Sequence, residues 1–361
     1  MNILLISTGL RLGGAELQIC NLADEYIKHG HNVMILTLEN KIEVRPLSVN
    51  VTINSLNIKK NILSVLRNIS IAKNIIKKFK PDVVHSHMIH ANIFSRILRL
   101  FVSMPKLIST AHSSNDGGII RIIAYRLTHR LANLSTNVSK NAVNSFEIKR
   151  AVPKGGMMVQ YNGINIERFT SSTSPNNYLS ELNIPHNSKV ILAIGRLTKA
   201  KDYPNLFNAI NKLKHTNITL LIAGDGKLQT ELKIQVKKMG LSKKILFLGN
   251  RNDVPMLINF ADLLVLSSEW EGFPTVIGEA MAGGCPVVTT DAGGAKEWFP
   301  QENLDLVVPI KNSTLLANKI DEILSLDVNT RIILINKLKT HVINNFSLSK
   351  IAQDWINIYR S

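Results

Sequence analysis

Cysteine is nearly missing from this chain of 361 residues, which contains only Cys20 and Cys285. Two cysteines so far apart in the sequence provide neither a disulfide framework nor the close spacing of a metal site. No stretch reaches the roughly 18 uninterrupted apolar residues that a membrane-spanning helix needs. The opening residues MNILLISTGLRLGG lack the basic start and the cleavage site of a signal peptide. These absences predict a protein of a reducing compartment, the cytoplasm.

Acidic residues are also scarce: 26 Asp and Glu stand against 43 Lys and Arg, which gives a net charge of +17. The excess is concentrated in residues 1–170, with 22 basic and 9 acidic residues (+13), whereas residues 171–361 carry 21 and 17 (+4). A basic half predicts an acidic partner, such as a nucleic acid, an anionic membrane or a phosphorylated substrate. Signatures of RRM, KH and zinc-finger domains are absent, so no nucleic-acid partner is expected.

Short apolar runs alternate with amphipathic stretches along the whole chain. The runs are rich in Ile, Val and Leu and lack a two-residue alternation, which is typical of parallel strands covered by helices on both faces. We therefore predict an α/β fold with two doubly wound, Rossmann-like domains. The predicted strands are 3–7, 33–38, 83–85, 106–109 and 134–138 in the first domain, and 190–194, 219–223, 245–248, 263–266 and 286–289 in the second.

The predicted domain boundaries follow the change in composition between the two series of strands. The first domain covers residues 1–170 and the second covers 188–345, with a polar, proline-containing linker at 171–187. A helix over 346–361 can pack back on the first domain. Ligands of open α/β sheets bind outside the carboxyl ends of the strands, so the expected site is a central cleft between the domains, lined by the loops that follow the strands.

The first strand is followed by a glycine-rich turn at residues 9–16, which contains Gly13 and Gly14 and leads into a helix. Glycines allow the backbone to approach a ligand, and the N-terminus of the helix favours an anion. The turn matches neither the dinucleotide-binding fingerprint nor the P-loop. A ligand-binding loop and a plain flexible turn are therefore equally good interpretations.

Two loops of the second domain carry groups suited to a phosphorylated sugar. Arg196 and Lys201 follow a strand directly and can both reach one diphosphate, although a solvated basic loop is the ordinary alternative. Glu271 and Glu279 flank a Gly-Phe-Pro turn and a short helix over 275–282. Their carboxylates suit the paired hydroxyls of a sugar, and the N–H groups at the start of the helix suit a phosphate. Two surface glutamates would give the same pattern.

Several ordered motifs together resemble the family-4 retaining glycosyltransferases of the GT-B fold. They are GGAE at 13–16, HSH at 85–87, STAHSS at 109–114, YNGIN at 161–165, GRLTKAKD at 195–202, AGDG at 223–226, FLGNRNDV at 247–254, the pair Glu271 and Glu279, and TTDAGG at 289–294. The resemblance covers nearly the whole chain. It implies a hexosyltransferase with two Rossmann-like domains that face each other across a cleft.

The resemblance also implies a role for each site residue. Arg196 and Lys201 would hold the diphosphate of a nucleotide-sugar donor, and Glu279 its ribose. Glu271 would hold the transferred sugar with the backbone N–H groups of Phe273, Thr275 and Val276. The remaining implied residues are Gly14, Asn250 and Arg251 on the donor side, Gly13 and His87 on the acceptor side, and His112, which is a catalytic candidate together with Glu271 and contacts the acceptor.

Metal independence is expected because the chain contains no D-x-D triplet, the usual carboxylate grip for a metal-bound nucleotide sugar. Arg196 and Lys201 can neutralise the leaving diphosphate instead. His85 and His87 share one face of a strand, but no Cys or carboxylate cluster accompanies them, so a metal site there is the weaker interpretation. We expect no cofactor, with a UDP-sugar as co-substrate.

The reaction implied by the family retains the anomeric configuration by a same-face displacement, in which the departing phosphate oxygen takes the acceptor proton. Basic amphipathic stretches at 59–80 and 119–131 can lie on an anionic membrane, although packing on the sheet with solvated charges explains each equally well. A lipid-linked diphosphate acceptor suits such a surface. We expect peripheral attachment to the inner face of the cytoplasmic membrane and a role in bacterial surface polysaccharide assembly.

Other activities on the same fold are a UDP-sugar epimerase and a non-catalytic nucleotide-sugar-binding protein. An epimerase needs acid and base carboxylates, of which the first half has few, and a degenerate relative would not keep every polar residue named above. Two positions depart from the family pattern. Asn165 stands where Asp is usual, and Pro274 replaces a small residue.

Overall fold

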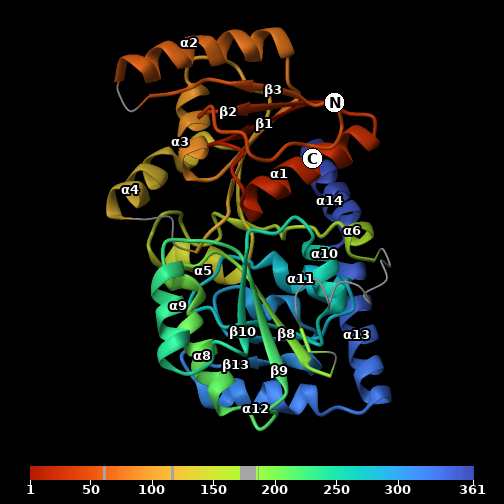
Figure 1. Cartoon of the computed structure of the whole chain (residues 1–361). Helices are drawn as coiled ribbons and strands as arrows, with labels where there is room; N and C mark the ends of the chain where they lie inside the picture. Colours follow the sequence, from red (N-terminus) through yellow and green to blue (C-terminus); the bar gives the residue numbers. More distant parts are fainter. Residues whose placement is uncertain (60–61, 115–117, 171–183, 186) are drawn as a thin grey trace. The chain divides into compact units, whose positions relative to one another are not determined.

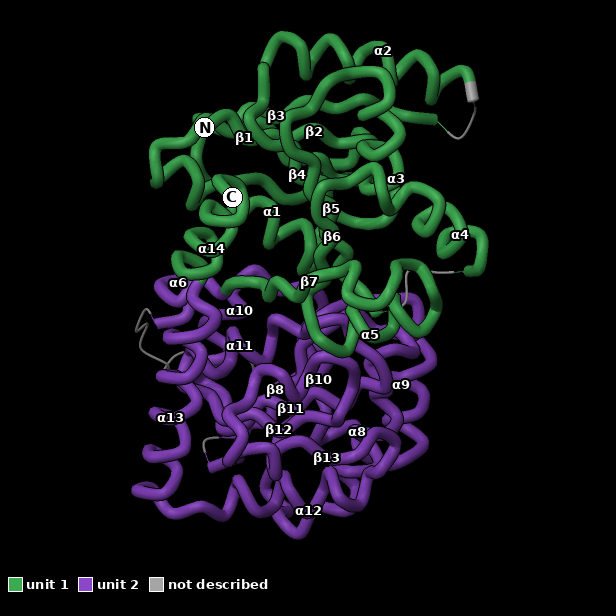
Figure 2. The backbone as a smooth tube through the Cα atoms, turned by 180° about the vertical axis from the view of Figure 1, so that it is seen from behind, with its two compact units in different colours: residues 1–163, 348–361 green, residues 164–347 purple. Residues whose placement is uncertain are grey.

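The computed structural model describes residues 1–59, 62–114, 118–170, 184–185 and 187–361. The chain divides into two compact units, which Figure 2 shows in different colours: unit 1 is residues 1–163 with 348–361, and unit 2 is residues 164–347. Most of the expected linker, residues 171–183 and 186, lies outside the described residues. Residues 164–170 belong to unit 2 rather than to the first domain, and the last helix belongs to unit 1.

Unit 1 contains a seven-stranded parallel sheet with the strand order β3-β2-β1-β4-β5-β6-β7, of which β1, β2 and β3 are labelled in Figure 1. Its strands are β1 (Asn2–Ser7), β2 (Asn32–Thr37), β3 (Thr52–Ser55), β4 (Val83–His87), β5 (Leu107–Ala111), β6 (Leu134–Asn137) and β7 (Met158–Val159). Its helices are α1 (Gly14–Lys28), α2 (Ile62–Phe79), α3 (Ile89–Leu98), α4 (Ile119–Thr128), α5 (Lys140–Ile148) and α14 (Leu348–Arg360).

Unit 2 contains a six-stranded parallel sheet with the order β10-β9-β8-β11-β12-β13. Its strands are β8 (Lys189–Ile194), β9 (Ile218–Ala223), β10 (Ile245–Gly249), β11 (Leu263–Leu266), β12 (Val287–Thr290) and β13 (Val307–Val308). Its α-helices are α6 (Ile166–Thr170), α8 (Tyr203–Lys212), α9 (Gln229–Lys238), α10 (Val254–Phe260), α11 (Thr275–Ala282), α12 (Ser313–Leu324) and α13 (Val328–Phe346).

These sheets confirm the predicted α/β fold with two doubly wound domains, and every predicted strand is present with its ends shifted by a few residues. The sequence did not predict β3, β7 and β13. All three lie at an edge of their sheet and contain two to four residues. β7 and β13 are too short, and β3 too polar, to show the run of four or more apolar residues that identifies a buried strand.

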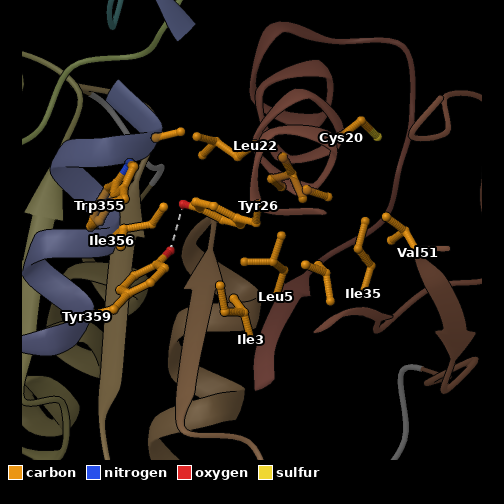
Figure 3. Packing of buried hydrophobic residues seen from close by; sticks show 14 of the residues in the cluster. Ile3, Leu5, Cys20, Leu22, Tyr26, Ile35, Val51, Trp355, Ile356 and Tyr359 are labelled. Atoms are coloured by element: carbon orange, nitrogen blue, oxygen red, sulfur yellow. Dashed lines mark hydrogen bonds between the residues drawn. The ribbon is translucent and has the colours of Figure 1, made fainter. Parts of the chain in front are cut away.

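The sheet of unit 1 is buried on both faces, which explains why its strands do not alternate between apolar and polar residues. Ile3 and Leu5 of β1 pack with α1 and α14 on one face (Figure 3). Leu4 and Ile6 pack with α2 and α3 on the other face. Helix α14 contributes Trp355, Ile356 and Tyr359 to the first of these clusters. Residues from the end of the chain therefore complete the core of unit 1.

Gly163, in the YNGIN motif, provides the close approach that α14 requires. A Cβ atom at this position would lie 2.7 Å from the Cα of Leu348. Two residues later, the side chain of Asn165 accepts a hydrogen bond from the backbone N–H of Arg168 at 3.2 Å, near the start of α6. An asparagine can accept this bond as an aspartate would, so the departure from the family pattern leaves the local structure intact.

Each sheet reverses its strand order at one point. In unit 1 the chain adds β2 and β3 on one side of β1 and then returns to place β4 on the other side. In unit 2 the same reversal places β11 beside β8. Ligands of doubly wound sheets bind at such points, outside the carboxyl ends of the strands. No helix in the described residues is long and apolar enough to cross a membrane.

Candidate functional site

The glycine-rich turn and His87 come together at the reversal point of unit 1. Ser7, at the end of β1, pairs with His87, at the end of β4. The turn after β1 leads to Gly13, the N-cap residue of α1, and to Gly14, the first residue of that helix. A Cβ atom at Gly13 would lie 2.6 Å from a carboxylate oxygen of Glu16. A side chain at Gly13 would therefore displace the carboxylate of Glu16 from the start of α1.

His87 and His112 form a pair across the ends of β4 and β5. The Nδ1 atom of His87 lies 3.0 Å from the Nε2 atom of His112. Burial lowers the pKa of His87 well below its ordinary value and that of His112 to about 4. Both rings are therefore neutral near pH 7, and the hydrogen bond between them uses one N–H group and one lone pair.

The histidine pair keeps two nitrogen atoms for a ligand. The Nε2 atom of His87 and the Nδ1 atom of His112 are buried and have no hydrogen-bond partner among the described residues. Whichever ring donates the shared bond, the other nitrogen of that ring is an acceptor, and the other nitrogen of its partner carries a proton. The pair thus offers one donor and one acceptor in either tautomeric arrangement, which is the pattern that one hydroxyl group can satisfy.

His85 does not present a free nitrogen beside this pair. Its Nδ1 atom lies 2.7 Å from the hydroxyl of Tyr359, and its Nε2 atom lies 2.6 Å from the hydroxyl of Thr110. The two histidines of the HSH motif therefore differ: both ring nitrogens of His85 are hydrogen-bonded, whereas Nε2 of His87 has no partner among the described residues. Across the part of the chain that the structure describes, no group of three His, Cys, Asp or Glu side chains is placed to hold a metal ion.

Lys201 and Glu271 meet at the reversal point of unit 2. Lys201 ends a short 3-10 helix, Lys199–Lys201, after β8, and its Nζ atom lies 2.6 Å from Oε1 of Glu271. The side chains are 17% and 14% exposed, so water screens this ion pair less than it would screen one on the surface. The hydroxyl of Ser268 donates to the same carboxylate oxygen at 2.6 Å. Two loops that are far apart in sequence are thereby joined.

Glycines allow the backbone to lie against both members of this ion pair. A Cβ atom at Gly195 would lie 2.7 Å from Cε of Lys201. Gly293, in the TTDAGG motif, has a φ of 61°, and a Cβ atom there would lie 2.0 Å from the carbonyl oxygen of Glu271. Any larger residue at either position would displace the lysine or the turn. This explains two of the glycines in the recognised motifs.

Arg196 extends from a loop whose backbone is fixed. The next residue, Leu197, donates its N–H to the carbonyl of Asp225 at 2.9 Å and accepts from the N–H of Leu228 at 3.1 Å. The AGDG motif therefore holds the loop. The side chain of Arg196 is exposed and makes no ion pair or side-chain hydrogen bond with the residues the structure describes. Its guanidinium is available to an anion.

Helix α11 begins at the predicted position, directly after Pro274. Thr275 and Val276 are its first two residues, and the N–H groups in the first turn of a helix lie at its positive end. Burial raises the pKa of the Glu279 carboxyl above its ordinary value, opposed by a hydrogen bond with Thr275 and the positive charges of Arg168 and Lys201. This end of α11 suits a group with several hydrogen-bonding oxygens.

Three other predicted donor residues have specific settings. The ring of Phe273 is buried and stacks on Trp298, with 4.1 Å between the ring centroids, so the side chain anchors the turn and only its backbone can face a ligand. Asn250 is exposed after β10. Arg251 forms a two-pronged ion pair with Asp253, which ties its guanidinium to the same loop.

The sequence reading did not identify Ser268, Tyr203 or Thr110 as parts of the site. Ser268 follows β11 directly, a position that could have identified it as a residue at the carboxyl edge. The hydroxyl of Tyr203 donates to the carbonyl of Gly195 at 2.9 Å, and Thr110 bonds to His85. The contact of Thr110 has no signal in the local sequence because it depends on the pairing of β4 with β5, and that of Tyr203 depends on how the loop after β8 folds back on itself.

Comparison with known proteins places this geometry in a family. A family model described as Glycosyl transferases group 1 matches residues 176–341, and one described as Glycosyltransferase Family 4 matches residues 12–168. An uncharacterized glycosyltransferase of Methanocaldococcus jannaschii is 29% identical over 97% of this chain and 94% of that protein. The crystal structure of Anabaena HepE in complex with UDP and glucose has a TM-score of 0.83 and 22% identity, covering 99% of both chains.

A further relative comes from Campylobacter jejuni and is 28% identical over 99% of this chain and 98% of its own length. Its name is GalNAc-alpha-(1->4)-GalNAc-alpha-(1->3)-diNAcBac-PP-undecaprenol alpha-1,4-N-acetyl-D-galactosaminyltransferase. The similarity extends over both units of the present chain.

Acidification should destabilise unit 1 through its buried histidines. Their pKa values are lowered on folding, so the unfolded chain takes up protons first as the pH falls below about 6.5. The free energy of unfolding should therefore fall between about pH 6.5 and pH 4, by up to roughly 3 kcal/mol for His112 alone. Urea unfolding over this range would measure the slope. A His112→Gln variant should show a shallower slope, and an unchanged slope would contradict the assignment.

Proposed function

The chain belongs to the family-4 glycosyltransferases, and we propose that it moves a hexose or N-acetylhexosamine from a UDP-sugar to a lipid-linked saccharide. The acceptor would be a saccharide on a polyprenyl diphosphate, used in assembly of a bacterial surface polysaccharide such as an O-antigen or capsule. The observation that carries the proposal is the pair formed by Lys201 and Glu271 beside the available guanidinium of Arg196, at the reversal point of unit 2.

The donor side of the proposal rests on complementary charge. A nucleoside diphosphate needs cations and N–H donors, which Arg196, Lys201 and the start of α11 supply. Its sugar hydroxyls need acceptors, which the carboxylates of Glu271 and Glu279 supply. Because Glu271 already holds Lys201, both groups are oriented before the donor arrives, and less ordering is required on binding. The UDP and glucose complex of HepE supports a donor of this class.

Transfer would break the bond between the anomeric carbon and the diphosphate oxygen and form a bond from that carbon to the acceptor oxygen. The proton of the acceptor hydroxyl would pass to the departing phosphate oxygen, and the new bond would form on the same face of the sugar. Negative charge develops on the diphosphate during this step. Arg196, Lys201 and the positive end of α11 would stabilise it in place of a metal ion.

The acceptor side rests on the histidine pair of unit 1. His87 and His112 offer one donor and one acceptor, so they can bind a sugar hydroxyl of the acceptor or of the transferred residue without taking its proton. Gly13, at the same reversal point, would let the acceptor lie close to the start of α1, and Gly14 would do the same for the donor. The name of the Campylobacter jejuni relative, which contains PP-undecaprenol, supports a lipid-linked acceptor.

Attachment to an anionic membrane is the third part of the proposal. Helix α4 exposes the apolar side chains of Ile119, Ile120, Ile123 and Leu127, and α2 exposes Leu63 and Leu66. Basic residues accompany both helices, and both neighbour α3. Such a surface combines apolar contact with attraction to anionic lipids. It would place the enzyme on the inner face of the membrane, beside a lipid-linked acceptor.

Incubation of the purified chain with UDP-sugars and a short polyprenyl-diphosphate disaccharide should give a product that is heavier by one hexose or N-acetylhexosamine. The activity should survive excess EDTA, because cationic side chains replace a metal ion at the diphosphate. Mass spectrometry of the lipid product and NMR of its new linkage would measure transfer and anomeric configuration. Loss with EDTA that Mn²⁺ or Mg²⁺ restores would contradict metal independence. Conversion of the UDP-sugar without acceptor would favour an epimerase instead.

Arg196→Ala and Lys201→Ala should each weaken UDP binding by about 1.5–3 kcal/mol, the size of a charge-assisted hydrogen bond. Lys199→Ala is the matched control, because this exposed lysine lies in the same loop and carries the same charge. Isothermal titration calorimetry with UDP would measure all three. If Lys199→Ala weakened binding as much as the other two, general attraction to a basic loop would replace the specific assignment.

Whole protein should sediment with anionic vesicles at low salt, and each engaged Lys or Arg should contribute about 1 kcal/mol. Replacing Lys73, Lys77, Lys78, Arg121 and Arg126 by Gln should weaken sedimentation strongly. The matched control removes five charges from unit 2 at Lys227, Lys233, Lys237, Lys238 and Lys243. Equal binding by the wild type and the first variant would show that the charges of α2 and α4 do not attach the protein. Binding to neutral vesicles would indicate apolar contact alone.

A further inference from the structure

The last helix of the chain reaches the histidines at the reversal point of unit 1. Tyr359 and Trp355 lie one turn apart on α14 and both contact His85, a ring with no exposed surface. Figure 3 shows the two α14 side chains opposite Tyr26 of α1. Packing alone would be satisfied by aliphatic residues at these positions. The polar contacts of this helix therefore need a separate explanation.

A continuous chain of hydrogen bonds runs from α1 through α14 to the sheet. The hydroxyls of Tyr26 and Tyr359 are 2.9 Å apart, and Tyr359 is 2.7 Å from Nδ1 of His85. Nε2 of His85 is 2.6 Å from the hydroxyl of Thr110, which is 2.7 Å from that of Thr136. Each group is buried, so none of the four bonds can be replaced by water without rearrangement.

The hydrogen bonds link the tautomer of His85 to the direction in which its neighbours donate. Burial raises the pKa values of Tyr26 and Tyr359 and lowers that of His85, so all three are neutral near pH 7. Each hydroxyl and the neutral imidazole has one proton to donate. Both bonds of His85 form only when one ring nitrogen donates and the other accepts from a hydroxyl. Without the hydroxyl of Tyr359, Nδ1 of His85 would lose its partner, and this constraint would disappear.

The orientation of His85 bears directly on the pair that faces the ligand. The ring of His85 lies against that of His87, with 4.0 Å between centroids and 36° between planes. Trp355 contacts His85 with 4.4 Å between centroids. His87 in turn bonds to His112. A change in the His85 ring is thus passed by direct contact to the nitrogen atoms that remain for the ligand.

We propose that Tyr359 and Trp355 are positioning residues, which hold His85 so that the His87–His112 pair is aimed at a substrate hydroxyl. The inference rests on the proposed function, because that function assigns the hydroxyl to the pair. It adds that the acceptor site is complete only when the C-terminal helix is in place. Removing the helix contact alters ligand geometry and not only the stability of unit 1.

The experiment compares two variants, each of which removes one buried hydroxyl from this series of hydrogen bonds. Tyr359→Phe removes the bond to His85, whereas Tyr26→Phe leaves it in place and is the matched control. Histidine side-chain ¹⁵N NMR of the full-length protein at pH 7 reports tautomers without any substrate. Tyr359→Phe should move the ¹⁵N shifts of His85 and His87, and Tyr26→Phe should leave the tautomer of His85 unchanged.

Kinetics provide the second readout. With the transfer assay described above, Tyr359→Phe should lower kcat/KM for the acceptor roughly tenfold, as expected from misplacement of a positioning contact. The KM for the UDP-sugar should stay within about twofold of wild type, because the charged residues proposed to bind the donor, Arg196, Lys201, Glu271 and Glu279, lie in unit 2. Tyr26→Phe should change either constant by less than about twofold.

Unchanged ¹⁵N shifts of His85 and His87 in Tyr359→Phe would overturn the inference, and so would equal kinetic losses in the two variants. If wild-type protein transfers no sugar, the proposed function fails while the NMR comparison still decides whether Tyr359 positions the histidines. If Tyr359→Phe does not fold, Trp355→Phe tests the other contact. It should shift the His85 and His87 resonances and lower acceptor kcat/KM, and unchanged values would contradict the proposal.

Discussion

In each sheet, one pair of strands brings together loops that are distant in sequence. The pair is β1 with β4 in unit 1 and β8 with β11 in unit 2, and each is formed by the first strand and the strand placed beside it after the reversal. Because all the paired strands are parallel, their carboxyl ends lie at one edge. The register of β1 and β4 sets Ser7 opposite His87. Pairing of β8 with β11 allows Lys201 to reach Glu271. Both parts of the candidate site depend on this single constraint.

Glycines let the backbone lie close to the side chains and turns of the site, and these close contacts fix where those groups lie. Gly195 and Gly293 leave room for Lys201 and for the turn that carries Glu271. Gly278 does the same at a distance, since a Cβ atom there would lie 2.3 Å from the ring of Trp298, on which Phe273 stacks. The start of α11 is thus held by the stack of Phe273 on Trp298 and by the close contact of Gly293 with the backbone of Glu271. A ligand would meet a surface that is already ordered.

Much of this arrangement could be predicted from the sequence because it leaves local marks. Apolar runs identify the central strands, and Pro274 with the glycines at 283–284 marks α11 closely. Polar residues that directly follow a strand must lie at the carboxyl edge, which identifies Arg196, Lys201, Glu271 and His112. The ordered motifs identify the family. These signals require only neighbouring residues to be read together.

The remaining contacts could not be predicted because they join segments across the chain. The bond from Tyr359 to His85 links residues 274 positions apart, and in the sequence Tyr359 is only one apolar position on an amphipathic helix. The edge strands β3, β7 and β13 are too short or too polar to show the apolar run of a buried strand. The ion pair of Arg251 with Asp253 is local, yet the sequence does not show whether the guanidinium faces a ligand or its neighbour.

The electrostatics of the two units differ in a way that suits group transfer. In unit 2, Arg196 and Lys201 would lie beside the departing diphosphate of the proposed reaction. In unit 1, burial lowers the pKa values of His85, His87 and His112, so that three adjacent imidazoles remain uncharged. A cationic histidine would hold an acceptor oxygen's lone pair and oppose its attack. A neutral pair could bind the hydroxyl without that charge, and the positive charge of the proposed site would then lie with Arg196 and Lys201, where negative charge would develop.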